Sequence, residues 1–386
     1  MSPTLLSKLS KKIKTPFYVY DLDQIKKQAL ALKKTFQGAG HFHYAMKANS
    51  NLGILKLFKR LGLGVDVVSG GEIKIALKAG FKGPQMIFSG VGKTEEEINF
   101  ALKNKVHMIN VESIPEMLRI DRLAKKKKCV ASIALRLNPD VDAETHPHIT
   151  TGTYTNKFGI DFEDLDEAKK VLKSAQNLRL IGLTFHIGSQ ILNLSPLEKA
   201  FQRIIPIYQD LKNLGFPLEN LSVGGGIGIR YNQETPMSLE SYGDLVLKYL
   251  KPLRCNILCE PGRILVAESG VLVTEVQYVK RTRKKNFLIV DTGMNHLMRP
   301  ALYGAFHEMK AVESFKDRKT ETYDVVGPIC ESTDVLGVDR TMPEMKEGEK
   351  LLILNTGAYG YSMANNYNAQ PMPKEILVSG ARVFRR

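Results

Sequence analysis

The sequence predicts an α/β fold, a closed (β/α)₈ barrel of the TIM type followed by a smaller all-β domain. Eight short apolar runs recur between residues 41 and 263, and segments with apolar residues three and four positions apart separate them. Strands that alternate with amphipathic helices indicate a parallel sheet, and eight such units favour closure into a barrel over an open doubly wound sheet. After Gly270 apolar runs continue without long helices between them, which predicts the all-β domain.

The predicted barrel strands, in chain order, are residues 41–49, 65–69, 85–90, 108–113, 131–139, 181–189, 221–226 and 256–263. Helical patterns such as 71–78 and 165–175 lie between them. The strands predicted for the second domain are 271–281, 286–291, 322–326, 350–354 and 376–383, separated by turns rich in Gly, Pro and Asp. Residues 17–20 predict one further strand of that domain. We therefore expect residues 1–24 to contribute to the β-domain, 25–268 to form the barrel and 269–386 to form the β-domain.

Composition indicates an ordinary globular protein, with 386 residues of which 43% are hydrophobic and 25% charged. No apolar stretch approaches the length of a membrane span, so no membrane contact is expected. Residues 1–16 lack the apolar core of a secretory signal, and the four cysteines are too scattered for a disulfide framework. These observations predict a cytoplasmic protein.

The net charge of +15 raises the question of a nucleic-acid partner or an anionic ligand. The basic runs at 125–128 and 281–285 are short and carry no interleaved aromatic residues. No zinc-finger or helix-turn-helix signature accompanies them, so no nucleic acid is expected. Histidines, cysteines and carboxylates do not cluster with metal-ligand spacing, so no metal is expected either. Gly92-Lys93-Thr94 ends like a phosphate-binding P-loop, but Ile87 stands where that motif needs its first glycine.

Reactive side chains occur where the predicted barrel strands end, which is where barrel enzymes carry their active sites. Lys47 lies among apolar residues, and desolvation there would lower its pKa and make it a nucleophilic amine. The glycine triplet 224–226 and Arg263 follow the seventh and eighth strands, the usual phosphate site of such barrels. A nucleophilic lysine beside a phosphate site points to pyridoxal phosphate. The alternative is a lysine that only reaches solvent and glycines that only turn the chain.

The chain resembles the diaminopimelate decarboxylase family of the alanine-racemase-like class over nearly its whole length. The motifs that carry the resemblance are YAMKAN (44–49), DVVSGGE (66–72), FSGVGK (88–93), NVES (110–113), NKFGI (156–160), HIGSQ (186–190), EPGR (260–263), RPALYG (299–304), GPICES (327–332) and GAYG (357–360). RPALYG and GPICES together are specific to the diaminopimelate enzymes within the class. Thr333 and Phe306 depart from the family, which usually has Gly and often has Tyr at these positions.

The resemblance implies roles for residues around a pyridoxal 5'-phosphate cofactor. Lys47 would hold the cofactor covalently, Glu260 would pair with its pyridine nitrogen, and His186 would stack on its ring. A carboxylate beside that nitrogen keeps it protonated, as decarboxylation needs, whereas the related racemases place an arginine there. Asp66 and Arg136 match positions near the cofactor in the wider class. The expected phosphate ligands are Ser189, Gly224, Gly225, Gly226, and the loop of Glu260, Pro261, Gly262 and Arg263.

The implied reaction is the decarboxylation of meso-2,6-diaminopimelate to L-lysine and CO₂, the last step of lysine biosynthesis. Arg263, Arg299 and Tyr303 would bind the distal carboxylate of the substrate, and Tyr359 would contact both phosphate and substrate. Cys330 would return a proton to the carbanion, since a thiol with a pKa of about 8.5 is largely protonated at neutral pH. The commoner fate of a free cysteine is that of a small buried hydrophobe. The family also implies a homodimer with shared active sites, in which Glu331 of the partner pairs with the distal ammonium.

Three other functions stay open at this stage. A decarboxylase of ornithine, lysine, arginine or carboxynorspermidine would act on a substrate without the second carboxylate, and the Arg299 and Tyr303 pair would then have nothing to bind. Glu260 and the GPICES segment disfavour an alanine-racemase-type enzyme. A non-catalytic pyridoxal-phosphate carrier would resemble the barrel alone, whereas this chain continues through Cys330 and Tyr359.

Overall fold

The structure, a computed structural model, describes residues 1–142, 156–315 and 317–385. The chain divides into two compact units. The barrel unit comprises Ala29–Gly228 and Thr235–Gly262, and the β unit comprises Met1–Gln28, Ile229–Glu234 and Arg263–Arg386.

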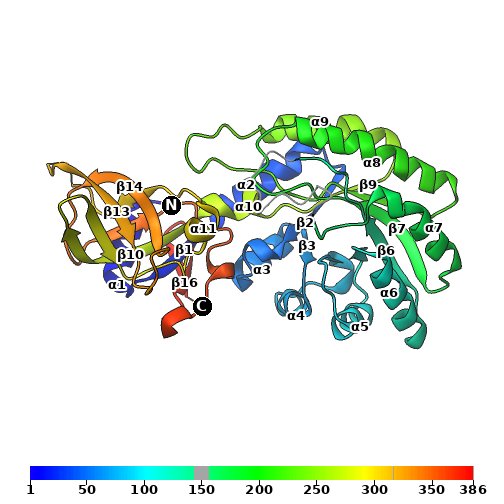
Figure 1. Cartoon of the computed structure of the whole chain (residues 1–386), viewed down its shortest axis with the longest axis horizontal. Helices are drawn as coiled ribbons and strands as arrows, with labels where there is room; N and C mark the ends of the chain where they lie inside the picture. The colour runs from blue at the N-terminus through cyan, green and yellow to red at the C-terminus, as the bar shows by residue number, and fades with distance from the viewer. Residues whose placement is uncertain (143–155, 316, 386) are drawn as a thin grey trace. The chain divides into compact units, whose positions relative to one another are not determined.

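The barrel unit contains a closed barrel of eight parallel strands among the described residues, as the sequence predicts (Figure 1). The strands, which pair in chain order, are β2 (Gly40–Ala45), β3 (Gly64–Val67), β4 (Met86–Phe88), β5 (Met108–Val111), β6 (Ala131–Arg136), β7 (Leu178–Thr184), β8 (Asn220–Ser222) and β9 (Asn256–Cys259). All eight end earlier than predicted, because the last residues of each motif turn into the loops. Met46–Ala48, for example, form a 3₁₀ turn (η1) directly after β2.

Five helices of the barrel unit, α3, α4, α5, α6 and α9, begin at side-chain caps. Ser69, Thr94 and Ser113 each accept a hydrogen bond from the backbone N–H of a glutamate three residues later, namely Glu72, Glu97 and Glu116. Such caps satisfy N–H groups that have no partner within the helix, so they fix where each helix starts. The helices are α2 (Leu22–Thr35), α3 (Leu52–Arg60), α4 (Gly70–Lys78), α5 (Glu95–Asn104), α6 (Ile114–Lys126), α7 (Leu165–Ser174), α8 (Ser195–Asn213) and α9 (Leu239–Leu250).

The β unit is built on a sheet of nine strands within the described residues, ordered β14-β13-β11-β10-β1-β16-β17, with β15 pairing β10 and β12. The strands are β1 (Phe17–Asp21), β10 (Gly270–Arg281), β11 (Asn286–Val290), β12 (Met309–Ala311), β13 (Thr320–Val326), β14 (Val335–Pro343), β15 (Lys350–Ile353), β16 (Lys374–Ser379) and β17 (Arg382–Arg385). The predicted N-terminal strand is confirmed, since β1 lies between β10 and β16. Phe17 and Val19 pack in one core with Val273 and Ile376.

Several elements of the β unit were not predicted. They are helix α1 (Pro3–Lys12), the short strand β12, and β14, whose pairing with β13 shifts register. The predicted strand 376–383 is in fact two strands, β16 and β17, joined by a turn in which Gly380 has a φ of +54°. Polar residues and register shifts break the alternation that identifies a strand in β14, which explains why the sequence pattern missed it.

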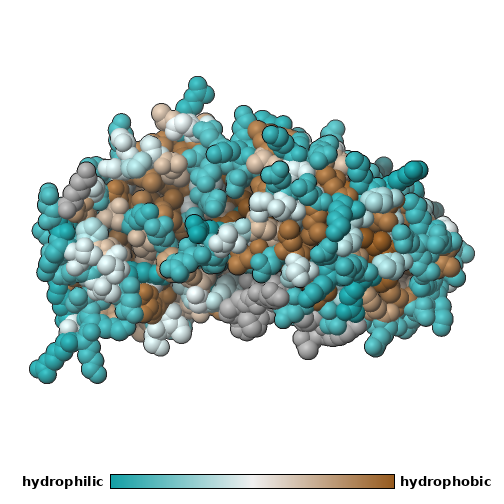
Figure 2. Space-filling view, turned by 90° about the horizontal axis from the view of Figure 1, so that it is seen from above, coloured by the Kyte–Doolittle hydropathy of each residue, from teal (hydrophilic) through white to brown (hydrophobic). Residues whose placement is uncertain are grey.

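None of the helices in the described ranges is long and apolar enough to cross a membrane. In the space-filling view, hydrophilic side chains cover much of the face shown, and apolar areas lie between them (Figure 2).

Candidate active site

Lys47 lies on the 3₁₀ turn η1 at the C-terminal end of the barrel, which we call the barrel mouth. Its neighbours Met46 and Ala48 are fully buried, but the Lys47 side chain is exposed. The desolvation expected from the apolar neighbours is therefore wrong, because the turn directs these neighbours into the core and leaves the lysine outside it. The amine is accessible to a ligand at the barrel mouth.

Two carboxylates of the barrel mouth have raised pKa values. Asp66 on β3 is 3% exposed, and burial raises its pKa although Lys47 and a hydrogen bond from Ser89 oppose the shift. Glu260 follows β9 and accepts a 2.6 Å hydrogen bond from the Ser222 hydroxyl. Burial first, and then the charge of Asp66, raise the pKa of Glu260 to about 7. A positive charge nearby would stabilise the ionised form of both carboxylates.

Glu72 is a third carboxylate with a raised pKa, and the sequence reasoning did not single it out. Its carboxylate accepts a 2.8 Å hydrogen bond from the N–H of Val68, but burial raises its pKa to about 7 and the charge of Asp66 adds to this. The signal in the sequence was the Ser69-x-x-Glu72 cap, which places a glutamate in the first turn of α4 beside the mouth.

His186 and the glycine triplet lie together beyond β7 and β8. The N–H of Gly225 donates to Nδ1 of His186 at 3.3 Å, so this nitrogen carries no proton. Burial lowers the pKa of His186 well below its usual value, and the charges of Lys47 and Arg136 lower it further, so the ring is neutral. Gly224 and Gly226 have φ values of +64° and +96°. A Cβ at Gly225 would lie 2.2 Å from the backbone oxygen of Glu260.

The remaining predicted cofactor residues of the barrel unit lie in adjoining loops. The carbonyl of Pro261 accepts a 3.0 Å hydrogen bond from the N–H of Ala45, and Gly262 packs closely on Ala45 and Ala48 on both sides of Lys47. Ser189 is partly buried in the segment after β7, where the N–H of Ile191 bonds to Gly226. The structure thus brings together at the barrel mouth Lys47, Asp66, His186, Ser189, the glycine triplet and the loop 260–262.

In the β unit, Arg263 and Arg299 form a second cluster, and both are buried, at 5% and 6% exposure. Arg263 donates a 2.9 Å hydrogen bond to the Tyr231 hydroxyl. The guanidinium carbon of Arg299 lies 4.4 Å from the centre of the Tyr231 ring, and its Nη1 donates to Nε2 of His307 at 2.8 Å. We call these four residues the arginine cluster.

The arginine cluster contains neutral partners where an ion pair would be usual. His307 donates from Nδ1 to the carbonyl of Leu354 at 2.8 Å, and burial together with Arg299 lowers its pKa to about 3, so it is neutral. Among the described residues, no Asp or Glu forms an ion pair with Arg299, and burial lowers its pKa. A buried cation without a counter-charge favours an anionic ligand. The sequence reasoning missed Tyr231 and His307, although His307 comes only three residues after RPALYG.

The other predicted residues of the β unit lie at two places. Tyr303 is on α11 (Arg299–Tyr303) with Arg299, and the guanidinium carbon of Arg263 lies 5.0 Å from the centre of the Tyr359 ring. Cys330 and Glu331 are exposed, so Cys330 is not the buried small hydrophobe that was its alternative. Within the described part of the chain, no hydrogen bond joins either residue to Arg299.

Glu331 and Cys330 are held by their own neighbours. The Glu331 carboxylate accepts hydrogen bonds from the hydroxyl of Tyr367 and, at 3.1 Å, from that of Thr333. The N–H of Cys330 donates to the side chain of Asn368 at 3.0 Å. Thr333, one of the two departures from the family pattern, thus contacts an expected substrate residue directly.

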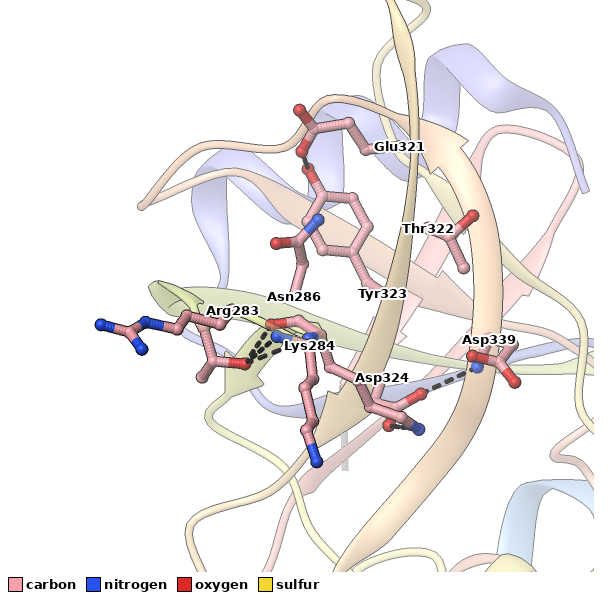
Figure 3. A pocket seen from close by; sticks show the side chains of 10 residues that line it. Arg283, Lys284, Asn286, Glu321, Thr322, Tyr323, Asp324 and Asp339 are labelled. Carbon is pink, nitrogen blue, oxygen red and sulfur yellow. Dashed lines mark hydrogen bonds and ion pairs between the residues drawn. The ribbon is translucent and has the colours of Figure 1, made fainter.

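A charged pocket elsewhere in the β unit serves as a contrast to the arginine cluster. It is lined by residues around the turn 282–285, and its acidic side chains Asp324 and Glu321 already have partners (Figure 3). Lys285 lies 2.6 Å from Asp324, and Glu321 accepts a 2.8 Å hydrogen bond from Tyr323. Arg283 points away from these groups. This pocket is therefore not a candidate active site.

Comparisons with known proteins identify the family to which the chain belongs. The family described as "Pyridoxal-dependent decarboxylase, pyridoxal binding domain" matches residues 22–267. A diaminopimelate decarboxylase from Neisseria meningitidis serogroup B is 47% identical over 382 residues, which cover 98% of this chain and 92% of the relative. The diaminopimelate decarboxylase of Helicobacter pylori strain J99 is 44% identical over 371 residues, 96% and 92% of the two chains.

Solved structures agree over the same length. Diaminopimelate decarboxylase from H. pylori, complexed with L-lysine, has a TM-score of 0.94 at 43% identity and covers 98% of this chain and 95% of its own. The enzyme from M. jannaschii, also in complex with L-lysine, has a TM-score of 0.92 at 36% identity, with 98% and 90% covered. A lysine decarboxylase from Selenomonas ruminantium, 24% identical over 98% of this chain and 96% of its own, shares the fold with a TM-score of 0.88. The chain therefore belongs to the diaminopimelate decarboxylase family of pyridoxal-phosphate-dependent carboxy-lyases.

Proposed function

We propose that the chain holds pyridoxal 5'-phosphate at Lys47 and decarboxylates meso-2,6-diaminopimelate to L-lysine and CO₂, the last step of lysine biosynthesis. The observation that carries this proposal is the charge pattern of the barrel mouth. An accessible amine lies there with Asp66 and Glu260, two carboxylates whose pKa values burial raises. The two solved relatives bound to L-lysine, the product of this reaction, support it.

The residues of the barrel mouth fit the cofactor. Glu260 suits a protonated pyridine nitrogen because an adjacent cation stabilises its buried carboxylate. His186 is neutral and anchored by Gly225, so its ring can stack on the cofactor. We assign the phosphate to Ser189 and Gly224–Gly226, with the loop 260–263 and Tyr359 as further contacts. When bound, pyridoxal phosphate acts as the electron sink for the carbanion that remains after CO₂ leaves.

We assign the recognition of the distal carboxylate to Arg263, Arg299 and Tyr303. The buried Arg299 guanidinium is oriented by Tyr231 and His307, which supply no negative charge. An arginine so placed can form charge-assisted hydrogen bonds to a carboxylate. Ornithine and lysine lack this second carboxylate, so they would leave Arg299 buried without a counter-charge.

Cys330 would return a proton to the carbanion, and Glu331 would bind the distal ammonium. Both side chains are exposed in the single chain. Their exposure supports a homodimer in which each chain contributes these two residues to the active site of its partner. A Cys330→Ala variant is expected to lose turnover far more than cofactor affinity, and unchanged turnover would remove Cys330 from the reaction.

We propose that residues 25–268 hold the cofactor and that residues 1–24 with 269–386 form the domain that completes the active site, to which it contributes Arg299, Tyr303 and Tyr359. We also propose that the enzyme works in the cytoplasm. All four cysteines, Cys129, Cys255, Cys259 and Cys330, are free, as is usual in a reducing compartment.

The test is to supply purified protein and pyridoxal phosphate with meso-diaminopimelate, ornithine, lysine and arginine in parallel, and to measure CO₂ and the amine product. Release from diaminopimelate alone is expected. Release from another amino acid would retain the cofactor assignment and overturn the substrate assignment. No release from any of them, with cofactor bound at Lys47, would favour a racemase or a carrier.

A further inference from the structure

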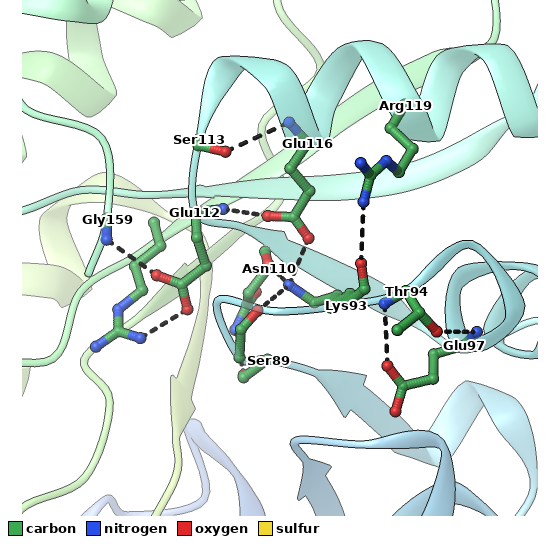
Figure 4. A network of polar contacts seen from close by, with 12 residues as sticks. Ser89, Lys93, Thr94, Glu97, Asn110, Glu112, Ser113, Glu116, Arg119 and Gly159 are labelled. Atoms are coloured by element: carbon green, nitrogen blue, oxygen red, sulfur yellow. Dashed lines mark hydrogen bonds and ion pairs between the residues drawn. The ribbon is translucent and has the colours of Figure 1, made fainter. Parts of the chain in front are cut away.

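Lys93, in the loop after β4, forms a buried ion pair with Glu116 that none of the proposed roles uses. It belongs to the P-loop-like sequence Gly92-Lys93-Thr94, and only 5% of it is exposed. Its ammonium donates three hydrogen bonds, to the Glu116 carboxylate at 2.7 Å and to the carbonyls of Gly90 and Asn110, each at 2.6 Å (Figure 4). Lys93 thereby joins the loop after β4, the strand β5 and the first turn of α6.

One branch of this network ends at Asp66. The side-chain amide of Asn110 donates to the Ser89 hydroxyl at 2.9 Å, and that hydroxyl donates to the Asp66 carboxylate at 2.6 Å. Because Asn110 occupies a lone pair of the Ser89 oxygen, the Ser89 proton is directed to Asp66. Lys93 holds the backbone of Asn110 and Gly90 in the positions that this chain requires.

A second branch ends at Arg136. The other oxygen of Glu116 accepts a 2.7 Å hydrogen bond from the N–H of Glu112. The Glu112 side chain accepts hydrogen bonds from Arg136 at 2.7 Å and from the N–H of Gly159 at 2.9 Å. One ion pair is thus connected to both charged groups, Asp66 and Arg136, that lie near Lys47 and His186.

We propose that Lys93 is a positioning residue for the cofactor pocket, which fixes the ends of β4 and β5 so that Ser89 holds Asp66 in its charged form. This role rests on the proposed function of Lys47. A buried lysine is costly unless all its hydrogens have partners, and a network that is fully satisfied is rigid. Asp66 and Lys47 interact electrostatically, since the charge of Lys47 favours the charged form of Asp66.

The proposal predicts a shift with a definite sign. Without Lys93 the carbonyls of Gly90 and Asn110 lose their donor, and the Ser89–Asp66 hydrogen bond loosens. Asp66 then takes up a proton more readily, and its charge no longer supports a proton at the Lys47 nitrogen. The pH at which the visible absorption of the bound cofactor titrates therefore falls.

The experiment compares Lys93→Met and Ser89→Ala with the control Glu97→Gln, all as holoenzymes. Glu97 also joins two loops, since it accepts hydrogen bonds from Thr94 and from Gly70, at 3.0 Å and 2.8 Å, and both donors are backbone N–H groups. For each variant we would measure the pH midpoint of the visible cofactor absorption, the cofactor Kd and the midpoint of thermal unfolding. Lys93→Met and Ser89→Ala are expected to lower the titration midpoint by about 0.5–1 pH unit.

The control distinguishes positioning from stability. Glu97→Gln is expected to lower the thermal midpoint and to leave the titration at its wild-type pH. A Lys93→Met enzyme that loses stability but titrates as wild type would overturn the proposal. If Lys93→Met does not fold, Asn110→Ala retains the ion pair and cuts only the branch to Asp66, and a wild-type titration of that variant overturns the proposal equally.

The same experiment separates this inference from the substrate assignment. The titration needs cofactor but no substrate, so a wild-type enzyme that releases no CO₂ from diaminopimelate leaves it intact. A wild-type protein without the visible absorption of bound cofactor would overturn both the Lys47 assignment and the role of Lys93.

Discussion

The barrel mouth and the arginine cluster have opposite electrostatics. At the mouth, burial raises the pKa of the carboxyls of Asp66, Glu72 and Glu260, because their ionised forms lack solvation and would be stabilised by a positive charge nearby. In the β unit, the buried Arg299 is held by neutral groups, so positive charge is in excess. Each unit therefore offers the charge that one part of the reaction needs, a cationic cofactor ring in the first and a carboxylate of the substrate in the second.

Excess buried charge costs stability, and the two units differ in how they limit the cost. The mouth can take up protons, because the pKa values of Glu72 and Glu260 are about 7. Arginine cannot lose its proton near neutral pH, so the cluster surrounds it with an aromatic ring and hydrogen-bond acceptors. Buried charge that lowers stability is typical of functional sites, where activity and stability place opposing demands on the same residues.

Lys47→Ala is the largest expected effect, because it removes the one nucleophilic amine that we assign to the mouth. We expect turnover to fall roughly 10⁴-fold or more, and covalent cofactor to be absent. Lys56→Ala, at an exposed position on α3, is the matched control and should behave as wild type. Mass spectrometry after borohydride reduction checks the attachment, and a variant that retains both properties would remove Lys47 from the reaction.

Arg299→Met tests the role of the arginine cluster in binding the distal carboxylate of the substrate. A charge-assisted hydrogen bond contributes about 1.5–3 kcal/mol, so kcat/KM for diaminopimelate should fall roughly 10- to 150-fold. Cofactor affinity should remain at its wild-type value, because the cofactor is assigned to the barrel mouth. Arg283→Met, an exposed arginine of the same unit, is the control. An equal loss of cofactor affinity would contradict the separation of the two sites.

Glu260→Gln tests whether the buried carboxyl of Glu260 lowers the free energy of unfolding. The folded protein keeps the Glu260 proton up to pH about 7, whereas the unfolded chain loses it near the ordinary value of 4.5. The folded state thus binds more protons between these values, and rising pH destabilises the wild type. Glutamine cannot ionise, so the free energy of unfolding of the variant should rise relative to that of the wild type by about 3 kcal/mol between pH 4.5 and 7.

The measurement for Glu260 is urea unfolding of the cofactor-free protein at several pH values. Glu347→Gln, which replaces an exposed glutamate, is the control and should parallel the wild type throughout. If the difference between Glu260→Gln and wild type does not change with pH, Glu260 is charged in the folded protein across this range and the mouth is less strained than its burial indicates.

The sequence predicted the barrel and most of the mouth because both depend on local order. Residues such as Glu260 directly follow strands, and the ends of parallel strands meet at one end of a barrel. Two features escaped prediction for different reasons. The exposure of Lys47 depends on the 3₁₀ turn η1, which periodicity does not reveal, and the raised pKa of Glu72 depends on burial beside Asp66.

The arginine cluster depends on contacts between distant segments. Tyr231 comes from the loop after β8, yet it contacts Arg263 and Arg299, which lie far along the chain. No spacing rule connects these positions. The resemblance to the family predicted the two arginines. Tyr231 and His307, which orient them, were identified only from the folded structure.

Tyr231→Phe gives the smallest expected effect and separates the two functions of the tyrosine in the arginine cluster. The variant retains the ring beneath Arg299 but removes the hydroxyl that accepts from Arg263 at 2.9 Å. A hydrogen bond of about 1 kcal/mol corresponds to a rise in KM of roughly fivefold, with kcat little changed. Tyr278→Phe, where the ring is exposed, is the control. Because the ring orients Arg299, Tyr231→Ala should raise KM further than Tyr231→Phe does. Equal KM values for the two variants would show that the hydroxyl alone matters and that Arg299 is held by His307 without the ring.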